Sequence, residues 1–485
     1  MQQSLCPETT FVPAKSLQPE PQVAELPTAS QQFIAQQLVS QQVGLQTTAG
    51  FMPVPVSLTP WQLRTAQFAK ARQLAVLLGK IQAKAALYPE WLLKLTAGLQ
   101  TSATVPGQIW RTLQRLYQGN SGIPAAPETA LNHNLMLNRH DFLQDQHQQW
   151  RWVESNPIAA GMGPLNSRYL AILQQYQPAE DLTFATAADY ASNYAINDAI
   201  RLQARLLAQA TLARAGQPAT ARQPLMLIVV EAQEDNIFDQ QLLCDEVQRL
   251  GVRVERVSIP ELLHSQIDRQ HQLFWQAQQV DLLYWRTGYN PTAELSDAFW
   301  QFRARLELAE VTQCPTLAGQ LTGSKWFQHQ FTALLLGEPQ VVAARFALTS
   351  SDITLLQQAV LPSFAVAGIT PAQAQQLIAQ GYWYKTQQEG GGNVARAEAA
   401  LHKLAAADDS DLLMAPIDAQ VRHEPLYSLR HGKVTVASGH ISELGIFSLG
   451  DAAWYGGYLC RTKPAQNNEG GVHRGGAVLD TILLR

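Results

Sequence analysis

The sequence predicts a mixed α/β protein of more than one domain, with a glycine loop able to bind phosphate. Strand and helix patterns alternate between residues 223 and 325, and strand–helix–strand order implies parallel pairing. A second α/β segment, at about 350–437, holds three consecutive glycines in the run YKTQQEGGGN (384–393). The chain has 485 residues, of which 46% are hydrophobic, and this is enough to bury a large core.

The N-terminal part of the chain is predicted to be an arm followed by helical segments. Residues 1–30 hold Pro, Gln, Ser and Thr without a clear period, and we expect a mobile arm there. Apolar residues at helical spacing predict a core helix over 63–87 and a second long helix over 196–215, ended by the GQP run at 216–218. We assign 31–222 to the N-terminal part of the protein core.

Residues 223–325 form a predicted substrate-binding α/β domain. Its first strand, over 225–230, is a continuous apolar run, as expected of a buried parallel strand. The other elements continue the alternation: a helix over 237–250, strands over 252–257 and 280–285, and helices over 294–308 and 324–336.

A smaller α/β segment over 350–437 follows a return to the core over 326–349. Its glycine loop comes directly after a strand predicted over 382–385, and a small domain with such a loop is typical of a lid that closes over a nucleotide. The last residues, 438–485, alternate strands with glycine-rich loops and are assigned to the C-terminal part of the core. The remaining predicted elements of the lid are helices over 371–380 and 395–406, a strand over 412–417 and a hairpin over 426–438.

The composition narrows the classes of function. Only 15% of residues are charged, against about 25% in a typical protein, and the net charge is -4 without a basic stripe, so nucleic acid is not an expected partner. No apolar run approaches the roughly 18 residues of a membrane helix, and the first ten residues do not resemble a signal peptide. The four cysteines form no C-x-x-C motif. We therefore expect a cytoplasmic protein with reduced thiols.

The glycine triplet predicts an anion site. Backbone N–H groups of glycines can wrap around a phosphate, Lys385 adds positive charge, and Glu389 can hold a divalent cation. The run matches neither a Walker A loop nor G-x-G-x-x-G. A flexible surface loop is the alternative for glycines alone, and the flanking charges favour a nucleotide.

Two pairs of polar residues are each expected to share one strand face. Glu154 and Asn156 follow an aromatic, apolar run and offer oxygen ligands that suit Mg²⁺; an ordinary polar strand end is the alternative. Arg461 and Lys463 follow an apolar run and suit phosphate or carboxylate groups; a solvated basic strand is equally compatible. A second glycine loop comes after them at 469–472.

Further candidates are single residues near strand ends. Glu443 could accept hydrogen bonds from a ribose or adenine, and the MAPI run at 414–417 could line an adenine slot; a turn carboxylate and a buried strand are the alternatives. Arg139 and Arg286 could bind a carboxylate or form structural ion pairs. His140 and His473 are possible bases, although a lone histidine is more often satisfied or at the surface.

Taken together, these segments resemble the eukaryotic-type glutathione synthetase family from about residue 50 onward. The resemblance rests on nine segments in the family's order: LNRHDF (137–142), ESNPIAAG (154–161), EDNIFDQ (234–240), YWRTGY (284–289), LTGSK (321–325), KTQQEGGGN (385–393), MAPI (414–417), ISELGIF (441–447), and RTK with EGGV and AVLD (461–480).

This resemblance implies an ATP-grasp fold, in which a small glycine-loop lid and a central sheet hold ATP. It implies an ATP-dependent ligase that joins γ-glutamylcysteine to glycine through an acyl phosphate, with Mg²⁺ bound to the phosphates, and a homodimer. Two other functions stay open. One is a related ligase that uses a different acceptor, and the other is a non-catalytic protein that binds a nucleotide or thiol peptide.

The resemblance also assigns roles to individual residues. Magnesium ligands are Glu154, Asn156 and Glu389. Nucleotide contacts are Lys325, Lys385, Gly390, Gly391, Gly392, Asn393, Met414, Ile417, Glu443, Lys463 and Glu469. Dipeptide or acceptor contacts are Arg139, Ile158, Ala159, Ala160, Gly161, Glu234, Asn236, Gln240, Arg286, Tyr289, Val472 and His473. Arg461 is expected to bind the substrate carboxylate and to stabilise the acyl phosphate, which makes it the predicted catalytic residue.

The chain departs from the family pattern in three places. Ala159 and Gly161 stand where two serines usually contact the dipeptide, which removes two hydroxyl hydrogen bonds of about 0.5–1.5 kcal/mol each. The acceptor loop carries a His-Arg pair at 473–474 in place of two alanines, which motivates the hypothesis of a different acceptor. In the lid, Val394 replaces an asparagine and Arg396 an aromatic residue, so adenine packing is expected to differ.

Overall fold

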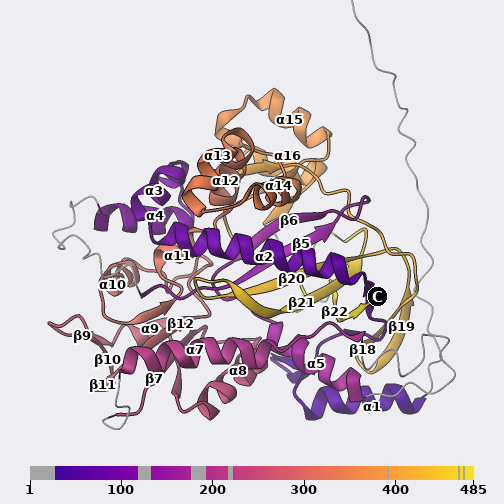
Figure 1. The fold of residues 1–485 in the computed structure, drawn as a ribbon, viewed down its shortest axis with the longest axis horizontal. Helices are drawn as coiled ribbons and strands as arrows, with labels where there is room; N and C mark the ends of the chain where they lie inside the picture. Colours follow the sequence, from indigo (N-terminus) through magenta and orange to yellow (C-terminus); the bar gives the residue numbers. More distant parts are fainter. Residues whose placement is uncertain are drawn as a thin grey trace, which may run out of the picture.

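The structure, a computed structural model, describes residues 28–117, 133–175, 193–216, 222–389, 393–467, 470–472 and 476–485 (Figure 1). The arm predicted over 1–30 lies almost wholly outside these ranges. Within them, three larger sheets, three small sheets and the helices around them form a mixed α/β fold. No helix in the described ranges is long and apolar enough to cross a membrane.

The largest sheet runs in the order β19-β18-β3-β22-β21-β20-β5-β6. Its neighbours pair antiparallel except β22 and β3, which are parallel. The strands are β3 (Val56–Ser57), β5 (Leu137–Gln144), β6 (Trp150–Asn156), β18 (Leu426–Arg430), β19 (Lys433–Ala437), β20 (His440–Leu449), β21 (Trp454–Pro464) and β22 (Val478–Asp480).

Helices cover both faces of this sheet. The long helix α2 (Thr65–Ala86) crosses one face so closely that a Cβ on Gly79 would lie 2.4 Å from Ser448 Oγ (Figure 1). On α5 (Gly163–Gln175), a Cβ on Gly163 would lie 2.6 Å from the ring of Phe447. Because successive residues of a strand point to opposite faces, α2 and α5 lie on opposite sides of β20. The helix predicted over 63–87 is thus confirmed as α2.

The second sheet is parallel, as predicted, with the order β13-β12-β7-β8. All six residues of β7 are buried, which explains its continuous apolar sequence. The prediction for β7 is confirmed at both ends. The elements of this segment are β7 (Leu225–Val230), α8 (Ile237–Arg249), β8 (Arg253–Ser258), α9 (Ile259–Leu262), β12 (Leu282–Trp285), α10 (Asp297–Leu306) and β13 (Thr312–Cys314), with a small sheet of β9 (Gln266–Ile267), β10 (Leu273–Trp275) and β11 (Gln278–Gln279).

The third sheet is antiparallel, in the order β14-β17-β15-β16, and has its own small core. The strands are β14 (Ser363–Ala365), β15 (Trp383–Lys385), β16 (Val394–Ala395) and β17 (Leu412–Met414), and the helices are α15 (Pro371–Ala379) and α16 (Ala397–Leu404). The hairpin predicted over 426–438 forms as β18 and β19, but it pairs with the largest sheet. The domain boundaries therefore stay a prediction.

Several predicted ends differ from the observed ones. The helix expected over 395–406 begins at Ala397, because Val394 and Ala395 form β16 against β15. The helix expected over 196–215 is α7 (Ala199–Ala215) and begins three residues later. The strand expected over 412–417 ends at Met414, shortly before Pro416, which has no N–H to donate to a ladder.

The remaining elements complete the surroundings of the sheets. They are α1 (Thr28–Ser40), β1 (Gly44–Thr47), β2 (Gly50–Pro53), β4 (Trp61–Leu63), α3 (Pro89–Leu95), η1 (Ala97–Leu99), α4 (Val105–Tyr117), α11 (Leu317–Leu321), α12 (Lys325–Gly337), α13 (Pro339–Phe346), α14 (Ser350–Ala359), η3 (Val366–Gly368) and β23 (Ile482–Leu484).

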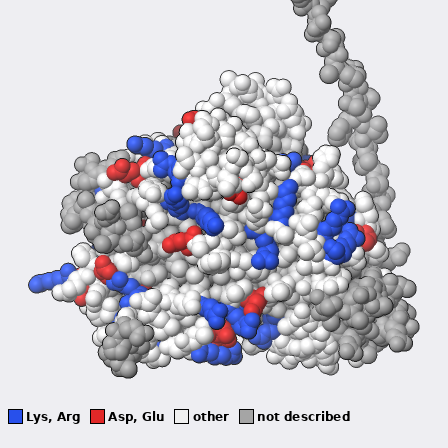
Figure 2. All heavy atoms as spheres, viewed as in Figure 1, with Lys and Arg blue, Asp and Glu red and all other residues white. Residues whose placement is uncertain are grey.

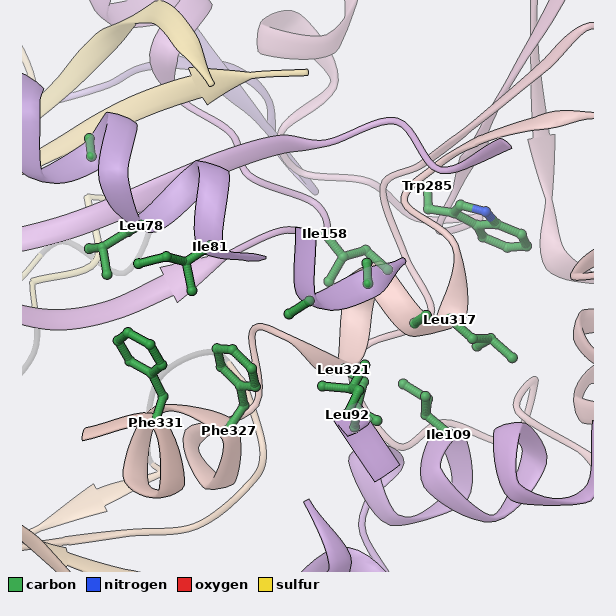
Figure 3. Close-up of a cluster of buried hydrophobic side chains, with 14 of the residues drawn as sticks. Leu78, Ile81, Leu92, Ile109, Ile158, Trp285, Leu317, Leu321, Phe327 and Phe331 are labelled. Carbon is green, nitrogen blue, oxygen red and sulfur yellow. The ribbon is translucent and has the colours of Figure 1, made fainter. Parts of the chain in front are cut away.

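One hydrophobic cluster connects segments that are far apart in the sequence. Figure 3 shows Leu78 and Ile81 of α2 facing Phe327 and Phe331 of α12. The same cluster extends through α11, α4 and α3 to Trp285 at the end of β12. It therefore fixes the end of the parallel sheet relative to α2 and the largest sheet.

Candidate functional site

A cleft with a volume of about 920 Å³ opens between the three sheets. Its floor comes from four neighbouring strands of the largest sheet: β6, β5, β20 and β21. Residues at alternate positions of these strands face the same side, and the register places Asp141 beside Glu154 and Glu443 beside Arg461. The walls come from the ends of β7 and β12, the start of α12, and β15 and β17.

A buried carboxylate, Asp141, joins the charged residues of the floor. It accepts two hydrogen bonds from Arg139, of 2.7 Å from Nε and 2.9 Å from Nη2. Its Oδ2 also accepts from Asn156 Nδ2 at 3.1 Å and lies 3.4 Å from Arg461 Nη2. Asp141 is not among the predicted site residues, although it stands two positions after Arg139 in one strand and so shares its face.

Arg461 lies between two carboxylates. It pairs with Glu443 across β20 and β21, and its Nη2 also contacts Asp141. These anions raise the pKa of the Arg461 guanidinium even though burial works in the opposite direction. The guanidinium is therefore held cationic at the cleft floor, where it lines the cavity together with Lys463.

Two buried lysines belong to a wall of the cleft. Lys325, the first residue of α12, donates from Nζ to the Gln388 carbonyl at 2.8 Å and to Glu389 Oε1 at 3.1 Å. Lys385 donates to the Val153 carbonyl at 3.3 Å. Only 4% of Lys325 and 7% of Lys385 are exposed, so two ammonium groups occupy one small region and favour a polyanionic ligand.

The charges of this wall shift one another's pKa values. Burial opposes ionisation of Glu154, but Lys325, Lys385 and the two floor arginines outweigh it and lower the pKa of Glu154. Burial, together with the neighbouring Glu154, raises the pKa of Glu389. Burial, reinforced by Lys325, lowers the pKa of Lys385. Such shifts gather where ligands bind or reactions occur.

The three predicted metal ligands provide only oxygen donors. Asn156 uses its Nδ2 group toward Asp141, which leaves its amide oxygen for another partner. Two carboxylates and one amide oxygen suit Mg²⁺, which keeps waters and substrate phosphates as its other ligands. The described residues contain no group of three His, Cys, Asp or Glu side chains that could hold a metal ion alone. The donor set fits magnesium held jointly with a phosphate ligand.

The turn at 158–161 brings two arginines together at the other end of the cleft. Arg286 donates to the Ala160 carbonyl at 2.9 Å, and Arg139 lies 3.3 Å from the Gly161 carbonyl. A Cβ on Gly161 would lie 2.6 Å from Arg286 Nη2 and 2.8 Å from Asn236 Nδ2. Glycine at position 161 therefore leaves room for the side chains of Arg286 and Asn236 to approach the turn.

Several buried polar atoms near this end have no hydrogen-bond partner among the described residues. They are Arg286 Nε, Asn236 Oδ1 and both amide atoms of Gln240. Because buried polar atoms are normally satisfied, and Arg286 and Asn236 line the cleft, a polar ligand is expected to pair with these two residues. Gln240 is buried and does not line the cavity. Val472, also predicted as a contact, is buried and does not line it either.

The apolar part of the cleft lies near the end of β17. Met414 and Ile417 line it, as the adenine-slot hypothesis requires. Arg396 stacks over Trp383, with its guanidinium carbon 4.8 Å from the ring centroid, and both residues line the cleft. Arg396 stands at the position where the family pattern has an aromatic residue, so this stack takes the place of that residue's ring.

Gln387 is a further buried residue near the cleft that is not among the predicted site residues. Its side chain is fully buried, accepts from the Trp326 N–H at the start of α12 and donates to the Ser410 carbonyl at 2.6 Å. It thus ties the strand before the glycine triplet to the helix that carries Lys325. Its position between Lys385 and Glu389 was the only signal in the sequence.

The cleft brings most of the predicted site residues together. Those that line it are Arg139, Glu154, Asn156, Ile158, Ala159, Ala160, Gly161, Glu234, Asn236, Arg286, Tyr289, Lys325, Lys385, Glu389, Asn393, Met414, Ile417, Glu443, Arg461 and Lys463. The predictions for Gly390, Gly391, Gly392, Glu469 and His473 fall outside the described residues. The individual roles stay predictions.

Two further observations concern His140 and the charges of the surface. His140 is buried between Ser155 Oγ and Ser448 Oγ, at 2.7 and 2.9 Å, and burial lowers its pKa to about 3. It is a satisfied core residue and does not line the cleft. On the face seen in Figure 2, lysines and arginines are scattered among other residues and form no basic stripe.

The fold and the cleft define a class of protein: an α/β protein with a cleft whose buried cations suit a polyanionic ligand. The chain belongs to the eukaryotic glutathione synthase family, because the family model described as "Eukaryotic glutathione synthase, ATP binding domain" matches residues 21–484. By this membership it is an ATP-dependent ligase.

Individual relatives agree with the family match. The chain is 30% identical to the glutathione synthetase of Xenopus laevis over 373 residues, which are 72% of this chain and 74% of the relative. It is 29% identical to that of Rattus norvegicus over 369 residues, 71% and 74% of the two chains. A solved glutathione synthetase-like effector from Globodera pallida, in its apo form, shares the fold with a TM-score of 0.67 and 16% identity, over 94% of this chain and 97% of the other.

Proposed function

We propose that this enzyme joins γ-glutamylcysteine to glycine with ATP and Mg²⁺, through an acyl phosphate, and releases ADP and phosphate. The observation that supports this most is the position of Arg461. It lies on the cleft floor with Arg139, and the same cavity is lined by Lys325 and Lys385. One cavity thus offers cations for a carboxylate and for a triphosphate.

The proposed mechanism relies on positioning and on neutralisation of charge. Arg139 and Arg286 hold the γ-glutamyl donor, and Lys325, Lys385 and Lys463 hold the phosphates of ATP. Arg461 neutralises charge as the donor carboxylate attacks the γ-phosphorus. No covalent protein nucleophile is required, because orientation and fixed charges account for most of the rate in phosphoryl transfer.

Magnesium, when bound by Glu154, Asn156 and Glu389, supplies positive charge to the phosphate oxygens. The amine of the acceptor then attacks the acyl carbon, the amide bond forms, and phosphate leaves with the electron pair of the broken C–O bond. We also propose that the nucleotide lies between the third sheet and the largest sheet in an ATP-grasp arrangement. A cytoplasmic homodimer is proposed from the family resemblance alone.

The test measures ADP release from the purified protein with γ-glutamylcysteine, Mg²⁺ and a panel of amino-acid acceptors, and identifies products by mass spectrometry. We expect ADP release to require the dipeptide. With glycine as the acceptor, we expect a product that has the mass of glutathione. If a larger product forms preferentially with another amino acid, that amino acid is the acceptor in place of glycine. Binding of ATP without turnover over the whole panel would contradict ligase activity.

A further inference from the structure

The floor of the cleft contains one carboxylate that none of the roles above uses. Asp141 is 0% exposed and does not line the cavity. It lies directly beneath residues that do line it, because its partners Arg139, Asn156 and Arg461 all face the cleft. These partners come from three strands, β5, β6 and β21.

The contacts of Asp141 determine how the two arginines lie. Arg139 binds it through two parallel hydrogen bonds, a geometry that fixes the plane of a guanidinium. Arg461 approaches the same Oδ2 at 3.4 Å. Two cations so close would repel each other, and a carboxylate between them offsets that repulsion and sets their separation. Glu443 is a second carboxylate at the same Nη2 atom of Arg461.

The backbone leaves little freedom for this carboxylate. Asp141 faces Gly445 across β5 and β20, where a Cβ would lie 2.5 Å from Asp141 Oδ1 and 2.7 Å from Arg139 Cδ. The glycine therefore provides the space in which the ion pair lies flat on the sheet. Asp141 also accepts from Asn156 Nδ2, which leaves the amide oxygen of Asn156 for another partner.

We propose that Asp141 is a positioning residue, which holds Arg139 and Arg461 at the separation needed to bind the donor substrate and neutralise its reacting carboxylate at the same time. The proposal rests on the proposed ligase function. It assigns to Asp141 no contact with substrate or nucleotide. Its effect on the reaction passes through the two arginines.

The test uses the variant Asp141→Asn, which removes the negative charge of the side chain and keeps its shape. The matched control is Asp281→Asn, because Asp281 is another fully buried carboxylate with a bidentate arginine, Arg222 at 2.7 and 2.5 Å, and it does not line the cleft. Steady-state kinetics give kcat and the KM for γ-glutamylcysteine, calorimetry gives the Kd of ADP without magnesium, and thermal melts report folding.

For Asp141→Asn we expect a fall in kcat of about 100-fold, the effect of misplacing a reacting group by about 1 Å, and a higher KM for γ-glutamylcysteine. The Kd of ADP stays within about threefold of wild type, because no assigned phosphate contact touches Asp141. Asp281→Asn lowers the melting temperature and leaves these kinetic constants unchanged.

The proposal is overturned if Asp141→Asn keeps kcat and the dipeptide KM within about threefold of wild type. It is also overturned if dipeptide turnover and ADP binding fall together with the melting temperature, because that result describes a purely structural residue. An inactive wild-type protein that still binds ADP would instead overturn the proposed function, on which this inference depends. The wild-type assay therefore separates the two failures.

Discussion

At the scale of single residues, the charges of the cleft are positioned by alternation along single strands and by pairing between strands far apart in the sequence. Strand alternation correctly placed Glu154 with Asn156, and Arg461 with Lys463, because the period of two is a local property of the backbone. The same alternation puts Asp141 on the face of Arg139, but it does not give the other partners of Asp141. Those partners lie on β6 and β21, and pairing between strands far apart in sequence is not encoded in local spacing.

The lowered pKa of Lys385 makes a prediction about nucleotide affinity. Burial and the nearby Lys325 lower this pKa, so the ammonium loses its proton at a lower pH than a free lysine, for which the value is about 10.4. Only the charged form of Lys385 attracts phosphate. Its contribution to the affinity for ADP is therefore complete below its pKa and is lost as the pH rises through that pKa. We expect ADP binding to weaken at alkaline pH, before ordinary lysines titrate.

Calorimetric titration of ADP between neutral and alkaline pH checks this expectation. Arginine stays charged throughout that range, so Lys385→Arg is expected to flatten the pH dependence. Lys80→Arg, at an exposed position on α2, is the control and leaves the profile unchanged. A profile that is identical for wild type and Lys385→Arg would show that Lys385 does not contribute its charge to the nucleotide.

At the scale of elements, the local pattern of apolar residues predicted an element correctly where the element is buried throughout or has one buried and one exposed face. The buried strand β7 and the long helix α2 follow directly from their apolar residues. The two-residue strand β16 did not, because its pairing with β15 depends on the path of the loop between them. The hairpin of β18 and β19 was recognised as a hairpin, but its place beside β3 is a tertiary property.

The packing of α2 on β20 makes a prediction at this scale. A Cβ on Gly79 would lie 2.4 Å from Ser448 Oγ and 2.8 Å from Ala453 Cβ, and Ser448 in turn contacts His140. Gly79→Val is therefore expected to destabilise the protein by about 1–3 kcal/mol, the usual cost of overpacking a core. Gly337→Val is the control, because nothing lies within 4 Å of that position.

Urea denaturation monitored by circular dichroism gives the free energy of unfolding of both variants. The expected change for the control is within about 0.5 kcal/mol, as for most surface positions. Equal stability of the two variants would mean that α2 does not approach β20 as closely as the structure indicates.

At the scale of the whole molecule, the sequence predicted a mixed α/β fold and a parallel sheet, but not how the sheets meet. The order of segments suggested separate units, whereas the cleft needs residues from the largest sheet, the parallel sheet and the third sheet together. What fixes the parallel sheet relative to the largest sheet is the cluster that joins α2, α12, α11 and Trp285. Such contacts depend on long-range packing, which no periodicity in the sequence describes.

The same arrangement carries the central claim, that one cavity couples transfer of phosphate from ATP to formation of an amide bond. If the donor carboxylate becomes an acyl phosphate, one of its oxygens must leave with the phosphate when the amine attacks. The donor carboxylate and the triphosphate must then bind together, between the floor arginines and the wall lysines.

The most direct measurement uses γ-glutamylcysteine labelled with ¹⁸O in the carboxyl group of its cysteine residue, with ATP, Mg²⁺ and glycine or whichever acceptor supports turnover. Mass spectrometry of the released inorganic phosphate and of the peptide product follows the label. We predict one ¹⁸O atom in each phosphate molecule and one retained in the new amide carbonyl. Unlabelled phosphate, released with or without a peptide product, would contradict the account.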